Sequence, residues 1–508
     1  MGAWNFDACS YLYNLMNLSK VKKAYFIGLK GVGMTALAQV LQGRGIEVLG
    51  SDTQEKFFTD EVLRKLGIRV IEGFNPKNIP TEADLIIASA AYLGQGTNNP
   101  EVAEAKKQGR SVLTYAQILG QLFKEKKGIA VAGTHGKSTV TAMLGLILEK
   151  AGFDPTVIVG SQVLQWQSNA RVGHSEYLVA EADEYRNNFL EYSPQILILT
   201  SLEYDHPDFF KDFRAYQETF EQLVQKIPPA GFIIANSLDE QVRETVRKAK
   251  CRLVEYGLPE EKIKLKIPGR HNLLNAAAAM KTALGLGIDK EIIKKVLTDF
   301  QGISRRFEIK SQWQGTLLID DYAHHPTEIK ATLAAAKEFY PEKKIWAVFQ
   351  PHTFSRTKAL LNDFAAAFGQ ADQVIVLDIY GSAREKAGRV KAQDLVNRIK
   401  KYKGAPLNHA FKESSFRTHR GRVSRFHALA FSEDVVERHA LWQKERNPQW
   451  QPFGTSRGQP FNAPKEKVRY IPTIEEVVEY LKKNVQSGQV ILTMGAGDVW
   501  RVLEEIAS

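Results

Sequence analysis

The stretch GIAVAGTHGKSTVTAMLGLILEKAG, residues 128–152, decides the fold class of this chain. A β-branched apolar run leads through a glycine-containing loop into a helical pattern. Phosphoryl transfer needs backbone N–H donors around phosphate oxygens, a lysine charge and a hydroxyl for Mg²⁺, and residues 133–138 offer all three. A strict P-loop has glycine where Val131 stands, so the stretch predicts a variant of that loop. The alternative is a glycine-rich turn that opens a helix and exposes its lysine.

A strand, glycines and a helix follow one another three times, which is typical of parallel α/β domains. The first copy is 24–52, and the third begins with strands at 317–323 and 345–351. Polar breaks at 123–128 and 301–308 separate the copies. The sequence therefore predicts three α/β domains: a Rossmann-like N-terminal domain (1–125), a central P-loop ATPase-like domain with a parallel sheet (126–302) and a Rossmann-like C-terminal domain with an irregular insertion (303–508).

Length and composition support this division. A chain of 508 residues has room for about three domains. Its 44% hydrophobic and 25% charged residues exclude collagen-like and wholly disordered classes, and two cysteines cannot form a disulfide framework. The first residues lack the pattern of a signal peptide, and no apolar run reaches about 18 residues. We therefore expect a cytoplasmic protein without membrane insertion. The net charge of +11 fits a nucleic-acid surface, a basic loop or phosphorylated small ligands.

Residues 404–466 interrupt the third domain with an irregular segment. It carries ten Lys/Arg, six Asp/Glu and four of the eleven histidines, with little sustained periodicity. Long loops without regular structure are commonly functional or disordered, so we expect a mobile or loosely packed excursion. Within it, residues 432–445 predict a short helix capped by Ser432.

Glycines follow the first strand of the N-terminal copy. Gly28, Gly31 and Gly33 form a G-x-x-G-x-G loop, which reverses the dinucleotide fingerprint and argues against an ordinary NAD enzyme. Asp52 ends the next strand, where an acidic residue accepts hydrogen bonds from ribose hydroxyls. A nucleoside-diphosphate site and tight packing of strand against helix explain these glycines equally well.

Acidic side chains follow two strands of the central copy. Glu181, Asp183 and Glu184 end one apolar run, and Asp205 and His206 end another. Carboxylates at the carboxyl ends of parallel strands beside a P-loop favour Mg²⁺. One acidic strand end alone is more often a solvated turn, but two in one nucleotide domain favour a metal site.

Three segments of the last copy each follow a predicted strand: 320–326, 348–357 and 380–386. Their side chains are expected to converge on one site, namely Asp321, Tyr322, His324, His352, Arg356 and Arg384. The paired histidines lack the spacing of a helical metal motif, which disfavours zinc. Each of these residues taken singly also suits a helix cap or the support of a loop.

Together these motifs resemble those of the Mur ligase family, in its alanine-adding branch. In family order the chain has AGTHGKST, EADE, YDH, GRHNLLNA (269–276), SRRF (304–307), DDYAHHPTE, FQPHTFSRT and TMGAGDVW (493–500). The resemblance covers nearly the whole chain except the extreme N-terminus and the 404–466 segment.

The resemblance implies an ATP- and Mg²⁺-dependent amide ligase of peptidoglycan precursor synthesis. It would join L-alanine to the lactyl carboxylate of UDP-N-acetylmuramate through an acyl phosphate. A cytoplasmic monomer or weak homodimer without a nucleic-acid partner is expected. One alternative is a murein-tripeptide recycling ligase, which shares the fold and ATP site but whose glycine loop differs from GLKGVGM. Another is a P-loop nucleic-acid-binding ATPase, which leaves DDYAHHP and HNLLN without a role.

The resemblance also implies roles for individual residues. For ATP they are Gly133, Thr134, His135, Gly136, Lys137, Ser138, Thr139, Asn272, Asn275, Arg306 and Asp321. The metal ligands are Ser138, Glu181 and His206, and the catalytic residues are Lys137, Glu181 and His206. Those for the UDP-linked substrate are Gly31, Gly33, Met34, Ser51, Asp52 and Ser89. Those for the amino acid are Tyr322, His324, His352, Arg356 and Arg384.

Three positions depart from the family pattern. Lys30 stands where the family usually has glycine, so its charge is expected to contact phosphate or face water. Thr353 replaces an arginine of some members, so the amino-acid carboxylate is expected to rely on Arg356. Lys211 is no good match for the modified lysine of other Mur ligases, which fits the alanine-adding branch. Domain closure is expected to hinge near Gly302.

Overall fold

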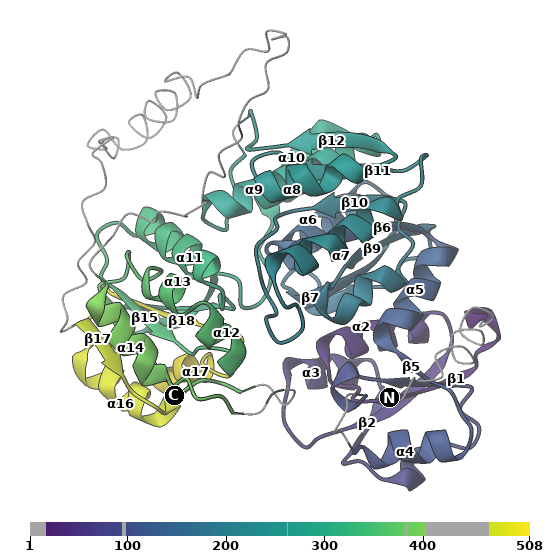
Figure 1. Ribbon diagram of the computed structural model, residues 1–508, viewed down its shortest axis with the longest axis horizontal. Helices are drawn as coiled ribbons and strands as arrows, with labels where there is room; N and C mark the ends of the chain where they lie inside the picture. Colours follow the sequence, from purple (N-terminus) through teal and green to yellow (C-terminus); the bar gives the residue numbers. More distant parts are fainter. Residues whose placement is uncertain (1–16, 94–97, 262, 382–384, 386, 403–466) are drawn as a thin grey trace, which may run out of the picture.

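The computed structural model describes residues 17–93, 98–261, 263–381, 385, 387–402 and 467–508. These residues form three α/β bodies, each built on its own sheet (Figure 1). The helix predicted over 432–445 and the remainder of the 404–466 segment lie outside the described residues. Among the described residues, no helix combines the length and the apolar character needed to cross a membrane.

The N-terminal body is a five-stranded parallel sheet in the order β3-β2-β1-β4-β5. Its strands are β1 (Lys23–Ile27), β2 (Glu47–Asp52), β3 (Arg69–Glu72), β4 (Leu85–Ala88) and β5 (Val112–Thr114). Its helices are η1 (Leu18–Lys20), α2 (Val32–Gly43), α3 (Phe58–Lys65), η2 (Pro76–Asn78), η3 (Ala90–Tyr92), α4 (Pro100–Lys107) and α5 (Tyr115–Glu125). Alternate β1 residues enter two different cores, because helices cover both faces of the sheet. The strand order reverses between β1 and β4, where open α/β sheets bind ligands.

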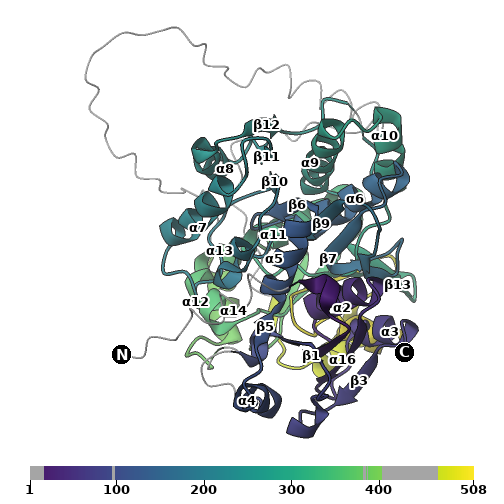
Figure 2. The ribbon, with the colours of Figure 1, turned by 90° about the vertical axis from the view of Figure 1, so that its right-hand side faces the viewer.

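The central body is a seven-stranded sheet in the order β12-β11-β10-β6-β9-β7-β8. Its strands are β6 (Lys127–Ala132), β7 (Thr156–Val163), β8 (Ser168–Arg171), β9 (Tyr177–Glu181), β10 (Ile196–Leu199), β11 (Phe232–Asn236) and β12 (Arg252–Tyr256). Its helices are α6 (Lys137–Lys150), η4 (Tyr185–Glu191), α7 (Phe213–Gln225), α8 (Glu240–Thr245), η5 (Val246–Lys248), α9 (Arg270–Gly285) and α10 (Lys290–Asp299). Helices α6, α9 and α10 pack on one face of the sheet, and α5 and α7 on the other (Figure 2). Strand β8 pairs antiparallel with β7, whereas the remaining neighbours pair in parallel.

The C-terminal body is a six-stranded sheet in the order β13-β14-β18-β15-β16-β17. Its strands are β13 (Glu308–Trp313), β14 (Thr316–Asp321), β15 (Ile345–Phe349), β16 (Gln373–Val376), β17 (Val468–Tyr470) and β18 (Val490–Met494). Helices α11 (Pro326–Phe339), α13 (Leu361–Ala365) and α14 (Ala392–Lys401) cover one face, and α16 (Ile474–Asn484) and α17 (Arg501–Ala507) the other. The antiparallel edge strand β13 was not predicted, because its EIKSQW sequence is largely exposed and lacks an apolar alternation.

The three bodies contact one another through specific hydrogen bonds. Gln39 of α2 donates to Asn169 Oδ1 of β8 at 2.9 Å, and both side chains are buried. The link to the C-terminal body runs along β7, since Leu164 N–H donates to Gly302 O at 3.3 Å and Ser304 N–H to Gln162 O at 2.8 Å. Gly302 itself has φ 99°. The link is therefore held on both sides of Ile303, and a hinge near Gly302 stays a prediction.

Candidate active site

The predicted P-loop connects β6 to α6. Gly136, the N-cap of α6, has a left-handed backbone with φ 84°, which residues with a Cβ rarely adopt. A Cβ there would overlap Asn275 Oδ1. Gly133 has φ 129°, and a Cβ on it would crowd Thr200 and Ser201. Close backbone approach at a helix N-terminus is what phosphate oxygens require, so this loop fits the phosphates of ATP.

The remaining loop residues are tied to the central sheet. Thr134 Oγ donates to Glu203 O at 3.0 Å and lies 2.9 Å from the Tyr216 hydroxyl. His135 N–H donates to Ser201 Oγ at 3.0 Å. Thr139 is buried in the first turn of α6. These contacts tie the loop to the central sheet.

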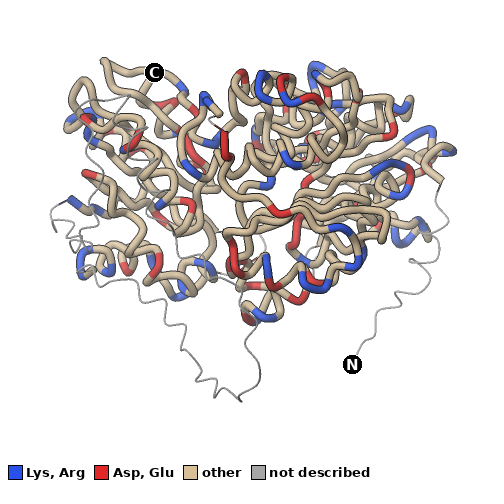
Figure 3. Tube along the Cα trace, turned by 90° about the horizontal axis from the view of Figure 1, so that it is seen from above, with Lys and Arg blue, Asp and Glu red and all other residues tan. Residues whose placement is uncertain are grey.

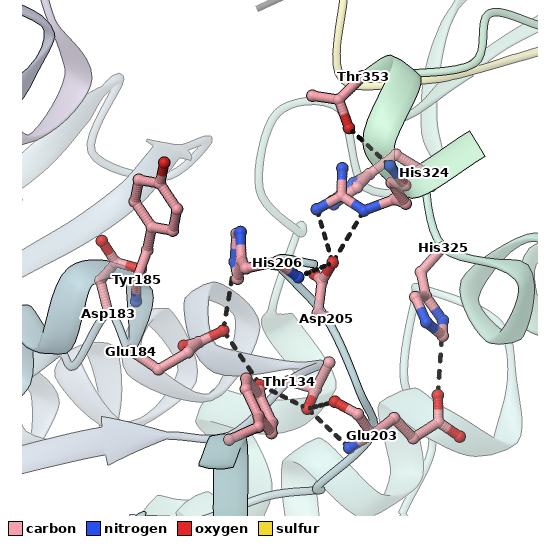
Figure 4. Close-up of polar contacts among 12 residues, drawn as sticks. Thr134, Asp183, Glu184, Tyr185, Glu203, Asp205, His206, His324, His325 and Thr353 are labelled. Carbon is pink, nitrogen blue, oxygen red and sulfur yellow. Dashed lines mark hydrogen bonds and ion pairs between the residues drawn. The ribbon is translucent and has the colours of Figure 1, made fainter. Parts of the chain in front are cut away.

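Lys137 lies among acidic groups. Its Nζ donates to Gly133 O at 2.6 Å and pairs with Glu184 Oε2 at 3.1 Å. Glu184 is 1% exposed and also lies 3.6 Å from His206 Nε2 (Figure 4). Burial raises the pKa of the Glu184 carboxyl, but the Lys137 charge and the His206 hydrogen bond outweigh it and lower the pKa to about 2. Glu184 thus links the P-loop lysine to His206.

The three predicted metal ligands fall into two groups. Ser138 hydrogen-bonds to Glu181, whose carboxylate also accepts the Gly160 N–H, and burial raises the pKa of Glu181. Two oxygen ligands beside a P-loop fit Mg²⁺. His206 instead contacts Glu184, and its φ of 55° is strained for a residue with a side chain.

Two asparagines at the start of α9 lie against the P-loop. Asn275 Nδ2 donates to Asn272 Oδ1 at 3.3 Å, and Asn272 Nδ2 donates to Pro268 O at 2.7 Å. Both asparagines are buried, and Asn275 Oδ1 faces Gly136. The structure therefore brings the predicted ATP residues of α9 to the nucleotide loop.

Asp321 and Arg306 belong to the C-terminal body. Asp321, at the end of β14, accepts the N–H groups of Phe307 at 2.9 Å and Ala323 at 2.7 Å. Burial raises the pKa of Asp321 to about 6. The Arg306 guanidinium lies over the Tyr322 ring, 5.3 Å from its centroid. Asp321 thus shapes the turn that presents Arg306.

His135 connects the P-loop with the C-terminal body. Its Nδ1 lies 3.2 Å from Glu328 Oε1 on α11, and its Nε2 lies 3.0 Å from Glu203 Oε2, which follows β10. Burial alone lowers the pKa of His135, but the two carboxylates outweigh it and raise the pKa to about 9. Arg306 Nη1 approaches the same Glu328 oxygen at 3.3 Å. The P-loop and a predicted ATP ligand therefore share one carboxylate.

Arg356 pairs across the same boundary. Its Nε and Nη2 donate to Asp205 Oδ1 at 2.8 and 2.7 Å, with side-chain exposures of 4% and 7%. Asp205 lies beside His206 in the loop after β10 (Figure 4). Arg356 Nη1 also lies 3.2 Å from His352 Nδ1. The predicted contact of Arg356 with an amino-acid carboxylate stays a prediction, because Asp205 holds two of its donors here.

The predicted amino-acid residues form a row of rings. The Tyr322 and His324 centroids are 5.2 Å apart, and those of His324 and His352 are 6.1 Å apart. Tyr380 continues the row at 6.0 Å from His352. Arg384 lies outside the described residues. The structure thus brings four of the five predicted residues together, including Arg356 beside His352.

The predicted residues for the UDP-linked substrate lie at the carboxyl ends of β1, β2 and β4. Gly31 is the N-cap of α2, Met34 is buried in its first turn, and a Cβ on Gly33 would meet the Tyr115 ring at 3.3 Å. Ser89 caps η3 directly after β4. This arrangement occupies the switch point between β1 and β4.

Ser51 and Asp52, at the end of β2, hold the glycine loop. Ser51 O accepts the Gly28 N–H at 2.8 Å, and its hydroxyl donates to buried Glu101 at 2.5 Å. Asp52 accepts the Lys30 N–H at 2.6 Å, and burial raises its pKa. Ser51 and Asp52 therefore hold the backbone of the 28–33 glycine loop, in addition to any contact that they make with a ligand.

The Lys30 side chain is enclosed by the protein and does not face water. Its side chain is 1% exposed, and its Nζ donates to Thr53 O at 2.9 Å and Glu55 O at 3.0 Å and pairs with Asp60 at 3.1 Å. Of the two alternatives for this charge, the one that faces water was wrong, and contact with a phosphate stays a prediction. Three oxygen acceptors satisfy the buried ammonium, which fastens the glycine loop to the 53–60 segment.

Sequence reasoning missed the partners of the predicted residues: Glu203, Tyr216 and Glu328, and the pairing roles of Glu184 and Asp205. Glu184 and Asp205 were recognised as acidic strand ends, but their pairing with Lys137 and Arg356 was not predicted. Glu328 lies in the quoted DDYAHHPTE motif, and this motif was the available signal.

These observations define a class: a three-body α/β protein whose central P-loop contacts its third body. Family models match all three parts. The model described as "Mur ligase family, catalytic domain" matches residues 23–127, "Mur ligase middle domain" matches 131–263, and "Mur ligase, glutamate ligase domain" matches 305–436. A curated relative, the UDP-N-acetylmuramate--L-alanine ligase of Desulfitobacterium hafniense (strain Y51), is 38% identical, covering 94% of this chain and 98% of the relative. The chain therefore belongs to the Mur ligase family.

Solved structures share this fold. The UDP-N-acetylmuramate-alanine ligase from Thermotoga maritima matches with a TM-score of 0.67 and 24% identity, covering 95% of this chain and 98% of that one. A murein peptide ligase from Psychrobacter arcticus matches with a TM-score of 0.63 and 21% identity, covering 96% and 98%. At these identities the likeness concerns the fold, which both kinds of ligase have in common.

Proposed function

We propose that this chain joins L-alanine to the lactyl carboxylate of UDP-N-acetylmuramate, with ATP cleaved to ADP and phosphate. One observation carries the proposal: the P-loop, the Glu184–His206 pair and the Tyr322–Arg356 row meet where the central and C-terminal bodies touch. Such a boundary brings a phosphoryl donor close to a residue set suited to a small amino acid. The 38% identical relative, named for this reaction, supports the same substrates.

The reaction has two steps. The lactyl carboxylate attacks the γ-phosphorus, which forms an acyl phosphate and releases ADP. The neutral amine of L-alanine then attacks the acyl carbon, phosphate leaves, and the amine loses a proton as the amide forms. Both steps build up charge on phosphoryl oxygens, so positioned cations and N–H donors stabilise their transition states.

The residues present fit ATP and Mg²⁺. The glycine loop 133–136 offers N–H donors, and the Lys137 ammonium, held by Gly133 O and Glu184, lies ready for the transferred group. Ser138 and Glu181 are the proposed metal ligands together with His206. A bound Mg²⁺ neutralises charge on the phosphate oxygens. Arg306 of the C-terminal body shares with His135 of this loop a contact to Glu328 Oε1.

The two proposed substrate sites lie in different bodies of the protein. The UDP part would bind at the carboxyl ends of β1, β2 and β4, where Gly31, Gly33 and Asp52 lie. L-Alanine would bind at the side chains of Tyr322, His324, His352 and Arg356. The domain limits 1–125, 126–302 and 303–508 belong to this proposal. We place the reaction in the cytoplasm, where ATP is available, and expect a monomer or weak homodimer.

The alternatives have less support. A murein-tripeptide ligase would share the fold, but the 38% identical relative is named for alanine addition. For a nucleic-acid-binding ATPase one expects a face of one charge. Figure 3 instead shows basic and acidic residues interspersed along the described trace, which does not favour the nucleic-acid-binding alternative.

One assay separates these functions. Purified protein receives Mg-ATP, UDP-N-acetylmuramate and single amino acids, and both ADP and the amide product are measured. ADP release that requires L-alanine supports the proposal. Turnover only with a tripeptide, or only with DNA or RNA, overturns it. Glycine and L-serine are included because one methyl or hydroxyl group changes specificity by only about 1–3 kcal/mol.

Two variants test the assignment of residues. Lys137→Ala should abolish ADP release, whereas Lys150→Ala, at the exposed end of the same helix, should leave it unchanged.

Arg356→Ala should chiefly raise the KM for L-alanine. An unchanged KM for L-alanine in Arg356→Ala would remove Arg356 from the amino-acid site.

A further inference from the structure

Glu328 lies at the third position of α11 and serves two sets of partners. Its Oε2 faces its own helix start, where it accepts the His324 N–H at 3.1 Å and the His325 N–H at 3.4 Å. This is the backbone half of a capping box, which satisfies N–H groups that the helix cannot pair. His324 is one of the proposed amino-acid residues, so this oxygen fixes the backbone of that pocket.

The other oxygen of Glu328 faces the nucleotide loop. Oε1 lies 3.2 Å from His135 Nδ1 and 3.3 Å from Arg306 Nη1. The Glu328 side chain is only 10% exposed. The Arg306 charge and the hydrogen bond with His135 oppose the effect of burial and hold the pKa of this carboxyl well below its usual range. The carboxylate is therefore charged and shared between the two sites.

Capping alone does not require a glutamate. In this chain Asp60 accepts the Phe57 N–H at 2.6 Å in α3, and Asp394 accepts the Lys391 N–H at 2.8 Å in α14. Each aspartate stands at the same third helix position as Glu328. A shorter carboxylate therefore suffices for the cap. The additional methylene of Glu328 is what lets the second oxygen reach the central body.

We propose that Glu328 is a positioning residue that couples nucleotide binding in the P-loop to the amino-acid pocket. Nucleotide contact that fixes His135 and Arg306 fixes Oε1, and the rigid carboxylate then fixes the His324 backbone through Oε2. Since coupling between two ligands is reciprocal, L-alanine must tighten nucleotide binding by the same factor. This inference rests on the proposed function, because it takes L-alanine as the second ligand.

The test measures that coupling factor in the full chain. Calorimetric titration gives the Kd of Mg-AMP-PNP at saturating UDP-N-acetylmuramate, with and without L-alanine. We expect L-alanine to tighten binding about tenfold in the wild type, within the usual range of coupling. Glu328→Asp keeps the charge and the cap, but its side chain is too short to contact His135. The factor by which L-alanine tightens nucleotide binding should therefore fall towards one. Asp394→Asn, which alters a cap in α14, should retain the wild-type factor.

Thermal midpoints separate coupling from folding. Glu328→Asp should lower the midpoint only moderately, because it keeps the cap but loses the contact with His135. Glu328→Gln, which keeps the length but loses the charge, is the second variant, and its coupling factor should also fall. A wild-type coupling factor in both variants overturns the proposal, as does a wild type without coupling. If the wild type consumes ATP with L-alanine while the variants keep full coupling, the positioning role fails and the proposed function stands. If the wild type shows no alanine-dependent ADP release, the proposed function fails first.

Discussion

His135 contributes to the structure through both its backbone and its ring. Its backbone belongs to the phosphate loop, while its ring lies between Glu203 of the central body and Glu328 of the C-terminal body. An imidazole in that position is stabilised as a cation, which explains why its pKa is raised to about 9 despite burial. The loop proposed to bind phosphates is therefore also a point where two bodies are held together.

The raised pKa of His135 predicts a pH-dependent contribution to stability. An ordinary histidine has a pKa of about 6.5. Because the folded state binds the proton more tightly, the contribution is fully present below pH of about 6.5 and is lost as the pH rises through about 9. We expect His135→Gln to lower the thermal midpoint most near pH 6 and hardly at all above pH of about 10.

Calorimetry of nucleotide-free protein across that pH range measures this difference. His174, with an 86% exposed side chain, offers the control His174→Gln, which should show no comparable trend. A constant difference between wild type and His135→Gln across the range would contradict the assignment of a charged His135.

At the scale of elements, the P-loop depends on its contact with α9. The helix starts at Gly269, whose φ of 99° turns the chain so that Asn272 and Asn275 lie against the loop. Backbone conformation at Gly136 and the amide of Asn275 therefore fit each other. Two segments far apart in sequence shape the proposed phosphate site.

Gly136→Ala should lose nucleotide binding. Its φ of 84° strains an alanine, and the added Cβ would displace Asn275. We expect the Kd of Mg-AMP-PNP to rise at least about tenfold, a change of about 1.4 kcal/mol. Gly45→Ala is the matched control, because Gly45 has φ 81° with nothing within 4 Å of its Cβ position. Similar loss of nucleotide affinity in both variants would assign the effect to general strain rather than to the site.

Local patterns predicted the elements that carry the site but not the pairs that join them. The 128–152 stretch became β6 and α6, because an apolar run, a glycine loop and helical periodicity are properties of neighbouring residues. Asp205 and Arg356 lie 151 positions apart, and no periodicity reports such a pairing. The burial of Lys30 was missed for the same reason, since its acceptors come from a different segment.

At the scale of the molecule, Ile303 packs in the central apolar cluster, but beyond it the C-terminal body meets the central body through backbone hydrogen bonds and charged pairs rather than a large shared apolar core. Its two hydrophobic clusters contain residues of that body alone, whereas one cluster runs from the N-terminal sheet into the central sheet. The contacts described between the central and C-terminal bodies include the Asp205–Arg356 and His135–Glu328 pairs. Polar boundaries are typical of domains that move relative to one another, which fits the predicted domain closure.

Asp205→Asn should loosen the C-terminal body. The substitution leaves Arg356 buried with a neutral partner, and removal of one member of a buried ion pair costs about 3–5 kcal/mol. We expect a larger radius of gyration in small-angle scattering of the ligand-free protein and a higher KM for L-alanine, because Arg356 loses its orientation. Glu149→Gln is the control, since Glu149 pairs with Arg171 at 3.4 Å inside the central body. An unchanged radius of gyration together with an unchanged KM would show that Asp205 does not hold the two bodies together.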